Sequence, residues 1–541
     1  MTGVAHPFSP QGRRAALRAM ADDTVDLLII GGGITGCGIA RDAALRGLRV
    51  ALVERDDFAC GTSGRSSKLV HGGLRYLAYG DFAMVRESVR EREVLKTIAP
   101  HLVHPLTFML PVHKGAEQVK YRLAFWIYDR MAASTADRHR WLSRREVLER
   151  APGLRMPLAG GFAYGEFMTD DARFTLENAQ SAAEYGALVA NHAPVTALLR
   201  ERGWITGAQV RDALSGEEYT VRAAVVVNAT GPWAEETLRL DGAPPARHRL
   251  RLSMGAHIIF SAVRLPLEGA VALESPAGKA GFAIRRWDSV YVGTTDDAYT
   301  GALNAVGAGR SAAAELLSLT RACFPSLNLT AADITGAWAG LRPLIAQEGR
   351  APRDTSRHDE IWRSPDGLIT IAGGKLTTYR PMAARVMRAV AQALGRSPGD
   401  EHLTAEVPLP GARGLAGRAT DLRDHGLPPA ATERISWLYG TQLADLLAQG
   451  PEWLEPLAPG VPALRGEVRL AVEREMAVTL TDFMDRRSGL LTFGPNQGRD
   501  AAAPAAAIMA GLLGWSETET ARQLSGYEQR AALASDALSQ L

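Results

Sequence analysis

The chain has 541 residues, which is enough for about two to four domains with cores of their own. Its 61 Lys and Arg residues nearly balance its 59 Asp and Glu residues, so the net charge gives no support for nucleic-acid binding. The three cysteines, Cys37, Cys60 and Cys323, lack metal-ligand spacing, so we expect free thiols in a reducing compartment and no metal site.

The N-terminal segment, residues 1–22, is poor in apolar side chains and carries Arg13, Arg14 and Arg18. It lacks the continuous apolar core of a secretory signal. No apolar run elsewhere reaches the roughly 18 residues that a membrane-spanning helix needs. We therefore interpret residues 1–22 as a flexible basic tail, and we expect no transmembrane helix.

The next segment predicts a strand, a glycine-rich turn, a helix and a second strand. Residues 26–30 form an apolar run of strand length, and Gly31, Gly33 and Gly36 then fill the frame G-x-G-x-x-G. These glycines allow a tight turn and the close approach of a pyrophosphate to the helix N-terminus. Glu54 ends the second strand, where its carboxylate can bond a ribose hydroxyl. An ordinary tight βα turn would not need this acid, so the segment favours an adenine dinucleotide site.

The loop after this unit, residues 58–77, is crowded with Gly, Ser and Thr. Such irregular backbone is rich in hydrogen-bond donors, and it can wrap a second phosphate and the edge of a flavin. A plain solvated loop is the alternative. Leu69, Val70 and Leu74 argue against that alternative, because they indicate contact with a core.

Two segments after the loop have informative compositions. Residues 81–98 have the periodicity of an amphipathic helix with a solvated, charged face. In residues 113–132, basic side chains lie beside aromatic ones such as Trp126, which is the composition of a membrane-interface segment. A core-packing helix with a basic shoulder fits this composition equally well.

The rest of the chain predicts a return to the nucleotide-binding domain, a second sheet and a helical tail. Residues 225–231 form a buried strand that ends in Ala-Thr-Gly, as in two-dinucleotide-binding-domain flavoproteins. Residues 251–300 are rich in strands, and we expect an antiparallel sheet in a second domain. Residues 368–372 predict another strand, and residues 373–375 open a helix whose N-terminus can face the electron-rich edge of a reduced flavin. Residues 421–541 are mostly helical, which indicates a separate domain with a structural role.

Several specific strings occur along the chain. They are Gly31–Gly36, Ser66–Leu77, Asn228–Trp233, Gly293–Asp296, Gly373–Tyr379 and Asp482–Arg487. In these strings the chain resembles FAD-dependent glycerol-3-phosphate dehydrogenase from about residue 24 to 400, and its helical tail is similar to that family's C-terminal domain. One departure is Arg286-Trp287, where the family usually has a Pro-Trp pair, so we expect a different local surface there.

The resemblance implies an α/β fold with three parts. They are a Rossmann-like FAD-binding domain of the two-dinucleotide-binding-domain flavoprotein type, a β-rich substrate domain and a C-terminal helical domain. The FAD-binding domain is expected to be discontinuous and to comprise residues 24–100, 165–250 and 335–400. The substrate domain would then comprise residues 101–164 and 251–334, and the helical domain residues 405–541.

The resemblance also implies one FAD, which we expect to be held without a covalent bond. The residues expected to bind it are Gly31, Gly33, Ile34, Thr35, Gly36, Glu54, Thr62, Ser63, Ser66, Ser67, Lys68, Leu69, His71, Gly72, Gly73, Ala229, Thr230, Gly231, Gly374, Lys375, Leu376 and Thr377.

The implied reaction is the oxidation of sn-glycerol 3-phosphate to dihydroxyacetone phosphate, in which a hydride moves from C2 to flavin N5. The substrate phosphate calls for Arg, whose planar fork grips oxygens bidentately. The residues expected at the substrate are Arg75, Tyr76, His257, Arg342, Arg357 and Lys375. Of these, His257, Arg342 and Lys375 are the expected catalytic residues. His257 is the candidate for orienting or deprotonating the hydroxyl, because imidazole titrates near neutrality. Arg342 or Lys375 with a depressed pKa is the alternative base.

Three functions compete at this point. A respiratory dehydrogenase passes its electrons to membrane quinone, an oxidase of the same fold passes them to oxygen and releases hydrogen peroxide, and an idle flavoprotein serves as a binding scaffold. The inserted segment of the family's oxidases is not seen, which favours the dehydrogenase, and Arg75, Arg342 and Lys375 argue against the scaffold. We expect a homodimer in the cytoplasm that associates peripherally with the membrane surface through residues 113–132, through the basic segment 1–22, or through both.

Overall fold

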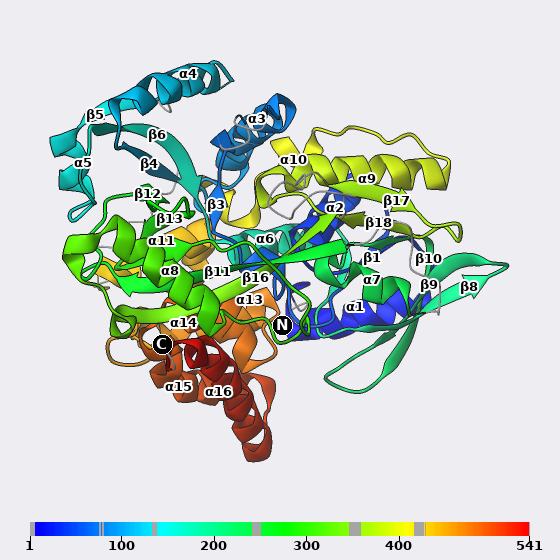
Figure 1. The fold of residues 1–541 in the computed structure, drawn as a ribbon. Helices are drawn as coiled ribbons and strands as arrows, with labels where there is room; N and C mark the ends of the chain where they lie inside the picture. The colour runs from blue at the N-terminus through cyan, green and yellow to red at the C-terminus, as the bar shows by residue number, and fades with distance from the viewer. Residues whose placement is uncertain are drawn as a thin grey trace.

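A computed structural model of the chain contains two β-sheets side by side and a helical region that packs against them (Figure 1). The structure describes residues 6–74, 77, 80–131, 138–240, 250–345, 359–415, 427 and 429–539. None of the described helices combines the length and the apolar character that crossing a membrane requires. The three cysteines are free thiols, as predicted.

The first sheet has eight strands within the described ranges, and its central part is parallel. The strands are β1 (Val25–Ile30), β2 (Val50–Val53), β7 (Leu188–Ala190), β8 (Val195–Glu201), β9 (Trp204–Arg211), β10 (Glu218–Asn228), β17 (Glu360–Arg363) and β18 (Ile369–Ala372). β1 lies between β2 and β10, and Ile30 is in register with Val53 on one side and Asn228 on the other. Because parallel strands are covered on both faces, β1 is apolar and buried from Leu27 to Ile30.

Helices cover both faces of this sheet, and alternate residues of β1 point to opposite faces. Leu27 and Ile29 belong to the core beneath α2 (Ile34–Leu45) and α9 (Tyr379–Leu394). Leu28 and Ile30 belong to a second core, which α1 (Pro10–Asp22) covers. α6 (Asp171–Glu184) packs on α2 and completes the first layer.

The prediction of a flexible basic tail is wrong for Pro10–Asp22, because these residues form α1. The Ser9 hydroxyl caps the helix by accepting a hydrogen bond from the Gly12 N–H. Leu17 and Met20 are fully buried against the sheet. Arg13 is buried as well, and its guanidinium forms a 2.6 Å ion pair with Asp212. The sequence suggested a solvated tail because the acid that neutralises Arg13 is distant along the chain.

The second sheet has ten strands within the described ranges. They are β3 (Leu69–Val70), β4 (His104–Val112), β5 (Arg140–Ser143), β6 (Gly160–Met168), β11 (Leu250–Ser261), β12 (Ala270–Glu274), β13 (Ala280–Arg286), β14 (Ser289–Gly293), β15 (Asp297–Ala298) and β16 (Ile334–Ile345). The antiparallel pairs β11–β14, β12–β13 and β13–β14 confirm the sheet predicted for residues 251–300. β11 also pairs along its whole length with β16, so that His257 faces Trp338 and Ser253 faces Arg342.

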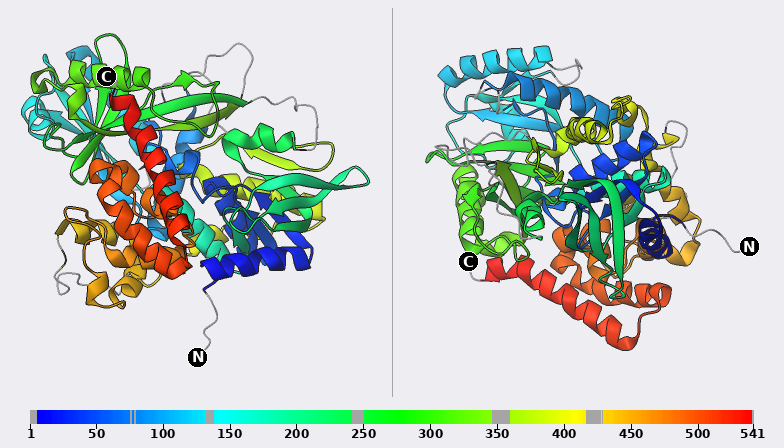
Figure 2. Two further views of the ribbon diagram at one scale, coloured as in Figure 1. Left: turned by 90° about the horizontal axis from the view of Figure 1, so that it is seen from below. Right: turned by 90° about the vertical axis from the view of Figure 1, so that its right-hand side faces the viewer.

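The remaining helices lie around the second sheet and in the C-terminal region. They are α3 (Phe82–Ile98), α4 (Gly115–Met131), α5 (Arg144–Arg150), α7 (Ala234–Leu238), α8 (Arg310–Cys323), α10 (Leu403–Glu406), α11 (Pro429–Tyr439), α12 (Leu443–Leu447), α13 (Arg465–Glu475), α14 (Leu490–Phe493), α15 (Arg499–Leu513) and α16 (Glu517–Ser539). α3 confirms the amphipathic helix predicted for residues 81–98, and most of the segment 113–132 also forms a helix, α4. α16 runs along the base of the molecule and contacts α8 and β16 (Figure 2).

Candidate active site

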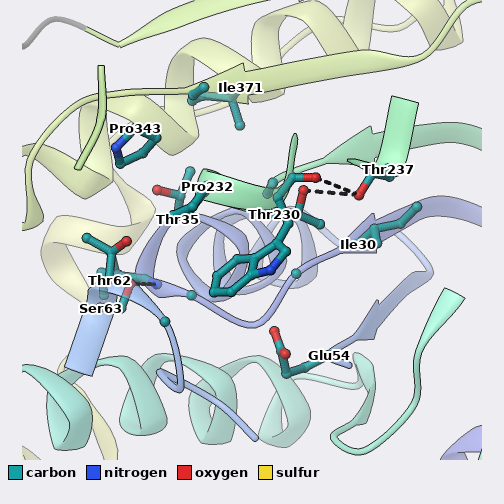
Figure 3. Close-up of a pocket in the computed structure, with 18 of the residues that line it drawn as sticks. Ile30, Thr35, Glu54, Thr62, Ser63, Thr230, Pro232, Thr237, Pro343 and Ile371 are labelled. Atoms are coloured by element: carbon teal, nitrogen blue, oxygen red, sulfur yellow. Dashed lines mark hydrogen bonds between the residues drawn. The ribbon is translucent and has the colours of Figure 1, made fainter. Parts of the chain in front are cut away.

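A cavity of about 270 Å³ opens at the carboxyl ends of the parallel strands β1, β2, β10 and β18 (Figure 3). In open α/β sheets ligands bind at this edge, where helix N-termini and loops meet. Glu54, Thr62, Ser63 and Thr230 stand around the cavity, and Ile371 at the end of β18 closes another side. Segments from three distant parts of the chain therefore form one site.

The glycine-rich turn forms a cradle that no larger side chain fits. Gly31 has a φ of 114°, a backbone conformation that favours glycine. A Cβ atom on Gly36 would lie 1.9 Å from the carbonyl oxygen of Gly31. α2 begins directly after Gly33, and its Ile34 N–H donates to the Ser63 hydroxyl over 2.8 Å. The positive end of the α2 dipole therefore lies at the cavity, together with a hydroxyl from the following loop.

Glu54 stands at the end of β2 with its carboxylate directed at the cavity (Figure 3). One oxygen accepts a 2.6 Å hydrogen bond from the Gly32 N–H, and the other accepts from the Asp56 N–H over 2.9 Å. Burial raises the pKa of Glu54 above its ordinary value, although both N–H bonds favour the charged form. The acid is thus fixed in orientation and keeps acceptor capacity for a ribose hydroxyl.

The far end of the cavity is formed by Gly373, Gly374 and Lys375. The two glycines have φ values of 84° and 81°, and a Cβ atom on Gly374 would lie 2.3 Å from the sulfur of Met382. Lys375 precedes the short helix Leu376–Thr378, which continues into α9. A second helix N-terminus therefore faces the cavity at the position predicted for the flavin.

Residues 58–77 are called the glycine-rich loop, and α6 holds its Ser66–Val70 part. The backbone N–H and the hydroxyl of Ser66 both donate to one oxygen of Asp171, and the Lys68 ammonium pairs with the other oxygen over 2.5 Å. Leu69 and Val70 form β3 and pair with β6. Asp171 therefore fixes the loop that passes from the cavity to the second sheet.

His257 lies on β11 and is almost fully buried. Its Nε2 is 2.9 Å from the Ser67 hydroxyl, and its ring stacks on Trp338 at 4.4 Å between centroids. Burial, together with the charges of Arg342 and Lys68, lowers the pKa of His257 well below its ordinary value. The imidazole is therefore neutral at pH 7, which is the form that can accept a proton.

Arg342 lies on β16, on the same face of the β11–β16 pair as His257, because strand residues at even spacing share a face. One terminal nitrogen donates to the Thr294 hydroxyl over 2.8 Å, and the other contacts Asp296 at 3.2 Å. A Cβ atom on Gly255 would lie 2.3 Å from the guanidinium, so this glycine makes room for it. These contacts fix the direction of a half-buried cation.

Comparison with known proteins identifies the family and the fold. A family model described as FAD dependent oxidoreductase matches residues 26–386, and one described as the C-terminal domain of alpha-glycerophosphate oxidase matches residues 402–520. The aerobic glycerol-3-phosphate dehydrogenase of Bacillus subtilis (strain 168) is 39% identical over 511 residues, which cover 91% of this chain and 92% of the relative. The enzyme of that name from Staphylococcus aureus (strain USA300) is 36% identical and covers 94% and 95%. The chain belongs to the FAD-dependent oxidoreductase family.

Solved structures agree with this assignment. The glycerol-3-phosphate dehydrogenase from Bacillus halodurans complexed with FAD superposes with a TM-score of 0.82 at 33% identity, over 98% of this chain and 99% of that one. The L-alpha-glycerophosphate oxidase from Mycoplasma pneumoniae with FAD bound has a TM-score of 0.54 at 18% identity, so it shares the fold alone. That match covers 72% of this chain and 99% of the other.

The residues of the cavity fit FAD, the cofactor of this family. The glycine cradle and the N-terminus of α2 suit a pyrophosphate, and Glu54 suits a ribose. The predicted cofactor residues that line the cavity are Gly31, Gly33, Ile34, Thr35, Glu54, Thr62, Ser63, Ser66, Ala229, Thr230, Gly231, Gly374, Lys375 and Leu376. Gly36, Ser67, Lys68, Leu69, His71, Gly72, Gly73 and Thr377 are outside this lining.

The predicted catalytic residues divide between two places. Lys375 lines the cavity, whereas His257 and Arg342 lie together on the neighbouring sheet. Arg75, Tyr76 and Arg357 lie outside the described residues. The hydrogen bond between Ser67 and His257 connects the glycine-rich loop of the cavity with that sheet.

A buried carboxylate that the sequence did not reveal supports the glycine-rich loop at Gly72. Glu166 on β6 accepts hydrogen bonds from the Gly72 N–H and the Tyr128 hydroxyl, both over 2.9 Å. Arg92 on α3 forms a 3.0 Å ion pair with it. The sequence offered no signal for this cluster beyond an acid inside an apolar strand.

Arg286, at the predicted departure from the family pattern, is also a buried cation. It pairs with Asp170 at 2.7 Å and donates to the carbonyl of Thr169. The guanidinium lies 4.9 Å from the ring centre of Phe493. The departure therefore affects the packing between the second sheet and the helical region, whereas the prediction concerned the surface.

Proposed function

We propose that this flavoprotein oxidises sn-glycerol 3-phosphate to dihydroxyacetone phosphate. The observation that carries the proposal is the position of neutral His257 and oriented Arg342 on one sheet face, beside a loop that lines the FAD cavity. The names of relatives that align over nine-tenths of the chain support the same substrate. FAD, when bound, supplies the two-electron oxidant.

Arg342 is proposed to bind the phosphate of the substrate. Its side chain is 19% exposed, so it combines a restricted environment with access for a ligand. Ser253, Thr294 and Asp296 hold the guanidinium in one orientation, which reduces the entropy lost when a phosphate binds. Lys375 is proposed to add a second positive charge from the cavity side.

His257 is proposed to orient the C2 hydroxyl and to take its proton. A base must be unprotonated at working pH, and the lowered pKa of His257 ensures this, but the same shift makes the imidazole a weaker proton acceptor than one that titrates near neutrality. The Ser67 hydroxyl engages Nε2, and Nδ1 is buried with no hydrogen-bond partner among the described residues. The base role of His257 competes with one for Lys375, and a His257→Gln variant that retains substrate reduction of the flavin at a normal rate would favour Lys375.

The experiment that tests the proposed activity is anaerobic titration of the purified yellow protein. Glycerol 3-phosphate should bleach the flavin absorbance, with dihydroxyacetone phosphate formed in equal amount. Glycerol at the same concentration is the matched control, because it has the same hydroxyl without the phosphate. An unchanged spectrum in a preparation that dithionite still bleaches would exclude this activity.

We further propose that membrane quinone accepts the electrons. The relatives named aerobic glycerol-3-phosphate dehydrogenase favour this acceptor, whereas the description of the C-terminal family names an oxidase. Mixing the reduced enzyme with a short-chain quinone or with air-saturated buffer distinguishes the two. Faster reoxidation by oxygen, with release of hydrogen peroxide, would show that the protein is an oxidase.

The proposed contact with the membrane surface is α4. Val119, Leu123 and Trp126 lie on one face of this helix and are 74%, 61% and 51% exposed, while Phe125 on the opposite face is buried. The Arg130 guanidinium lies 3.5 Å from the ring centre of Trp126, so an apolar stripe carries a cation at its edge. Such a stripe suits the boundary between lipid headgroups and acyl chains.

Flotation with anionic liposomes tests this contact. It also distinguishes a membrane contact from a contact between the two subunits of the expected homodimer. Replacing Val119, Leu123 and Trp126 together by Ser should abolish flotation at low salt. Replacing the exposed Trp204, the first residue of β9, is the control. If the triple variant floats as wild type does but changes from dimer to monomer, α4 is a subunit interface.

A further inference from the structure

A second cavity of about 560 Å³ lies beside the FAD cavity, where both sheets meet the helical region. Six described residues line both cavities, and residues of the helical region line the second one as well. The shared residues are Arg55, Cys60, Gly61, Thr62, Pro232 and Trp233. Four arginines of the described part of the chain line it. Arg55 and Arg65 come from the loop after β2, and Arg486 and Arg530 come from the helical region.

The two carboxylates in this lining are already paired. Asp482 accepts from Arg486 at 2.8 Å and from His192 at 3.0 Å. Asp56 is 3.2 Å from the guanidinium of Arg55. Neither acid therefore neutralises the other two arginines.

The carboxylate nearest to Arg65 and Arg530 does not neutralise both guanidinium groups. Arg65 pairs with Asp485 at 2.8 Å, but Asp485 also binds Arg486 at 3.2 Å. Within the described ranges, Arg530 has no hydrogen bond and no ion pair. The charge of Arg65, followed by burial, lowers the pKa of Arg530 to about 10. Two guanidinium groups therefore face one cavity and repel each other.

We propose that this second cavity binds a dianionic phosphate group between Arg65 and Arg530. Phosphate, like carboxylate, matches the planar guanidinium fork, and two forks that line one cavity suit a dianion. The ligand is inorganic phosphate or a phosphomonoester. The proposal does not depend on which substrate the flavin oxidises.

The phosphates of FAD do not account for these arginines. The pyrophosphate cradle is at the N-terminus of α2, and neither Arg65 nor Arg530 lines that cavity. Arg65 nevertheless directly precedes Ser66 and Ser67, which contact the cofactor cavity and His257. An anion at Arg65 and Arg530 would join this loop to α16, and so would link the helical region to the active site.

Calorimetric titration of the FAD-loaded enzyme with inorganic phosphate tests the proposal. The titration is made in the Arg342→Ala background, so that phosphate binding at the proposed substrate site does not contribute. Arg530→Gln should weaken binding about 10- to 150-fold, the loss expected for a charge-assisted hydrogen bond. Arg530→Lys should bind with intermediate affinity, because it keeps the charge and loses the fork.

Arg522→Gln is the matched control, because Arg522 lies on the same helix but is exposed and pairs with Glu519. It should bind phosphate as the parent does. A parallel titration with glycerol 2-phosphate distinguishes the two ligand sources, since the tighter of the two probes indicates the ligand class.

Thermal unfolding in chloride, without phosphate, gives an independent readout. Removing the charge of Arg530 relieves its repulsion with Arg65, so Arg530→Gln should be at least as stable as the parent. Phosphate at matched ionic strength should then raise the unfolding temperature of the parent and of Arg522→Gln, but not that of Arg530→Gln. Equal phosphate affinity in all variants, or a less stable Arg530→Gln in chloride, would overturn the proposal.

Discussion

Replacing Arg342 by Ala separates substrate recognition from packing. The side chain forms an ion pair with Asp296 and hydrogen bonds with Ser253 and Thr294, and it remains partly accessible. If it also binds the substrate phosphate, the variant loses a charge-assisted hydrogen bond of about 1.5–3 kcal/mol. We therefore expect kcat/KM for glycerol 3-phosphate to fall roughly 10- to 150-fold.

Glycerol is the reference substrate in this experiment, because it lacks the phosphate and should lose much less activity. Reduction of the flavin is followed anaerobically, so the acceptor does not limit the rate. Arg342→Lys should recover part of the loss, since it restores the charge without the bidentate fork. Arg264→Ala is the control for deletion of a surface cation, because Arg264 pairs with Asp333 away from the cavity and is 46% exposed.

An equal loss for both substrates would refute the reasoning. Arg342 would then act by holding Asp296 and Thr294 in place, and the phosphate would bind elsewhere. A loss confined to KM would instead mean that the contact is equally strong with the bound substrate and in the transition state.

Three further outcomes are expected. Acid precipitation should release FAD into the supernatant, and yellow colour in the pellet would show a covalent link. Arg13→Met should lower the free energy of unfolding in urea by roughly 3 kcal/mol, because it leaves buried Asp212 without its cation; Arg14→Ala on the exposed face should change it by less than about 0.5 kcal/mol. Because the pKa of His257 is lowered in the folded state, the unfolded state binds more protons below about pH 6.5, and the folded protein therefore loses stability as the pH is lowered through that range. His257→Gln should reduce this dependence, and an unchanged dependence would show that the imidazole titrates normally.

The cofactor cavity was predictable because its chemistry resides in short contiguous strings. The strand, the three glycines of the first turn and Glu54 each have a local physical requirement, and the structure meets these requirements within one βαβ unit. The same holds for Gly373 and Gly374, whose positive φ values precede a helix. Such strings fix local backbone geometry wherever the rest of the chain lies.

The supports of the site were not predictable in this way, because their partners are far apart in sequence. Asp171 holds Ser66 and Lys68, and Glu166 holds Gly72 and Arg92. A single sequence shows these acids only as charges inside apolar segments, where they resemble solvated positions. The wrong prediction of a flexible N-terminal tail has the same cause, because Asp212, which pairs with Arg13, is far away in the sequence.

The helical region contributes more to the flavin site than the structural role predicted for it suggests. Asp57, fully buried one residue before the glycine-rich loop, binds Arg486 at 2.5 Å and Arg487 at 2.6 Å. On α6, whose first residue holds that loop, Arg173 is buried against Glu475 of α13. An unpaired buried charge costs several kcal/mol, so neither contact can be lost without disturbing the backbone that carries it. The helical region thus anchors the start of the loop directly and its Ser66–Lys68 part through α6, which makes that region part of the flavin site's framework.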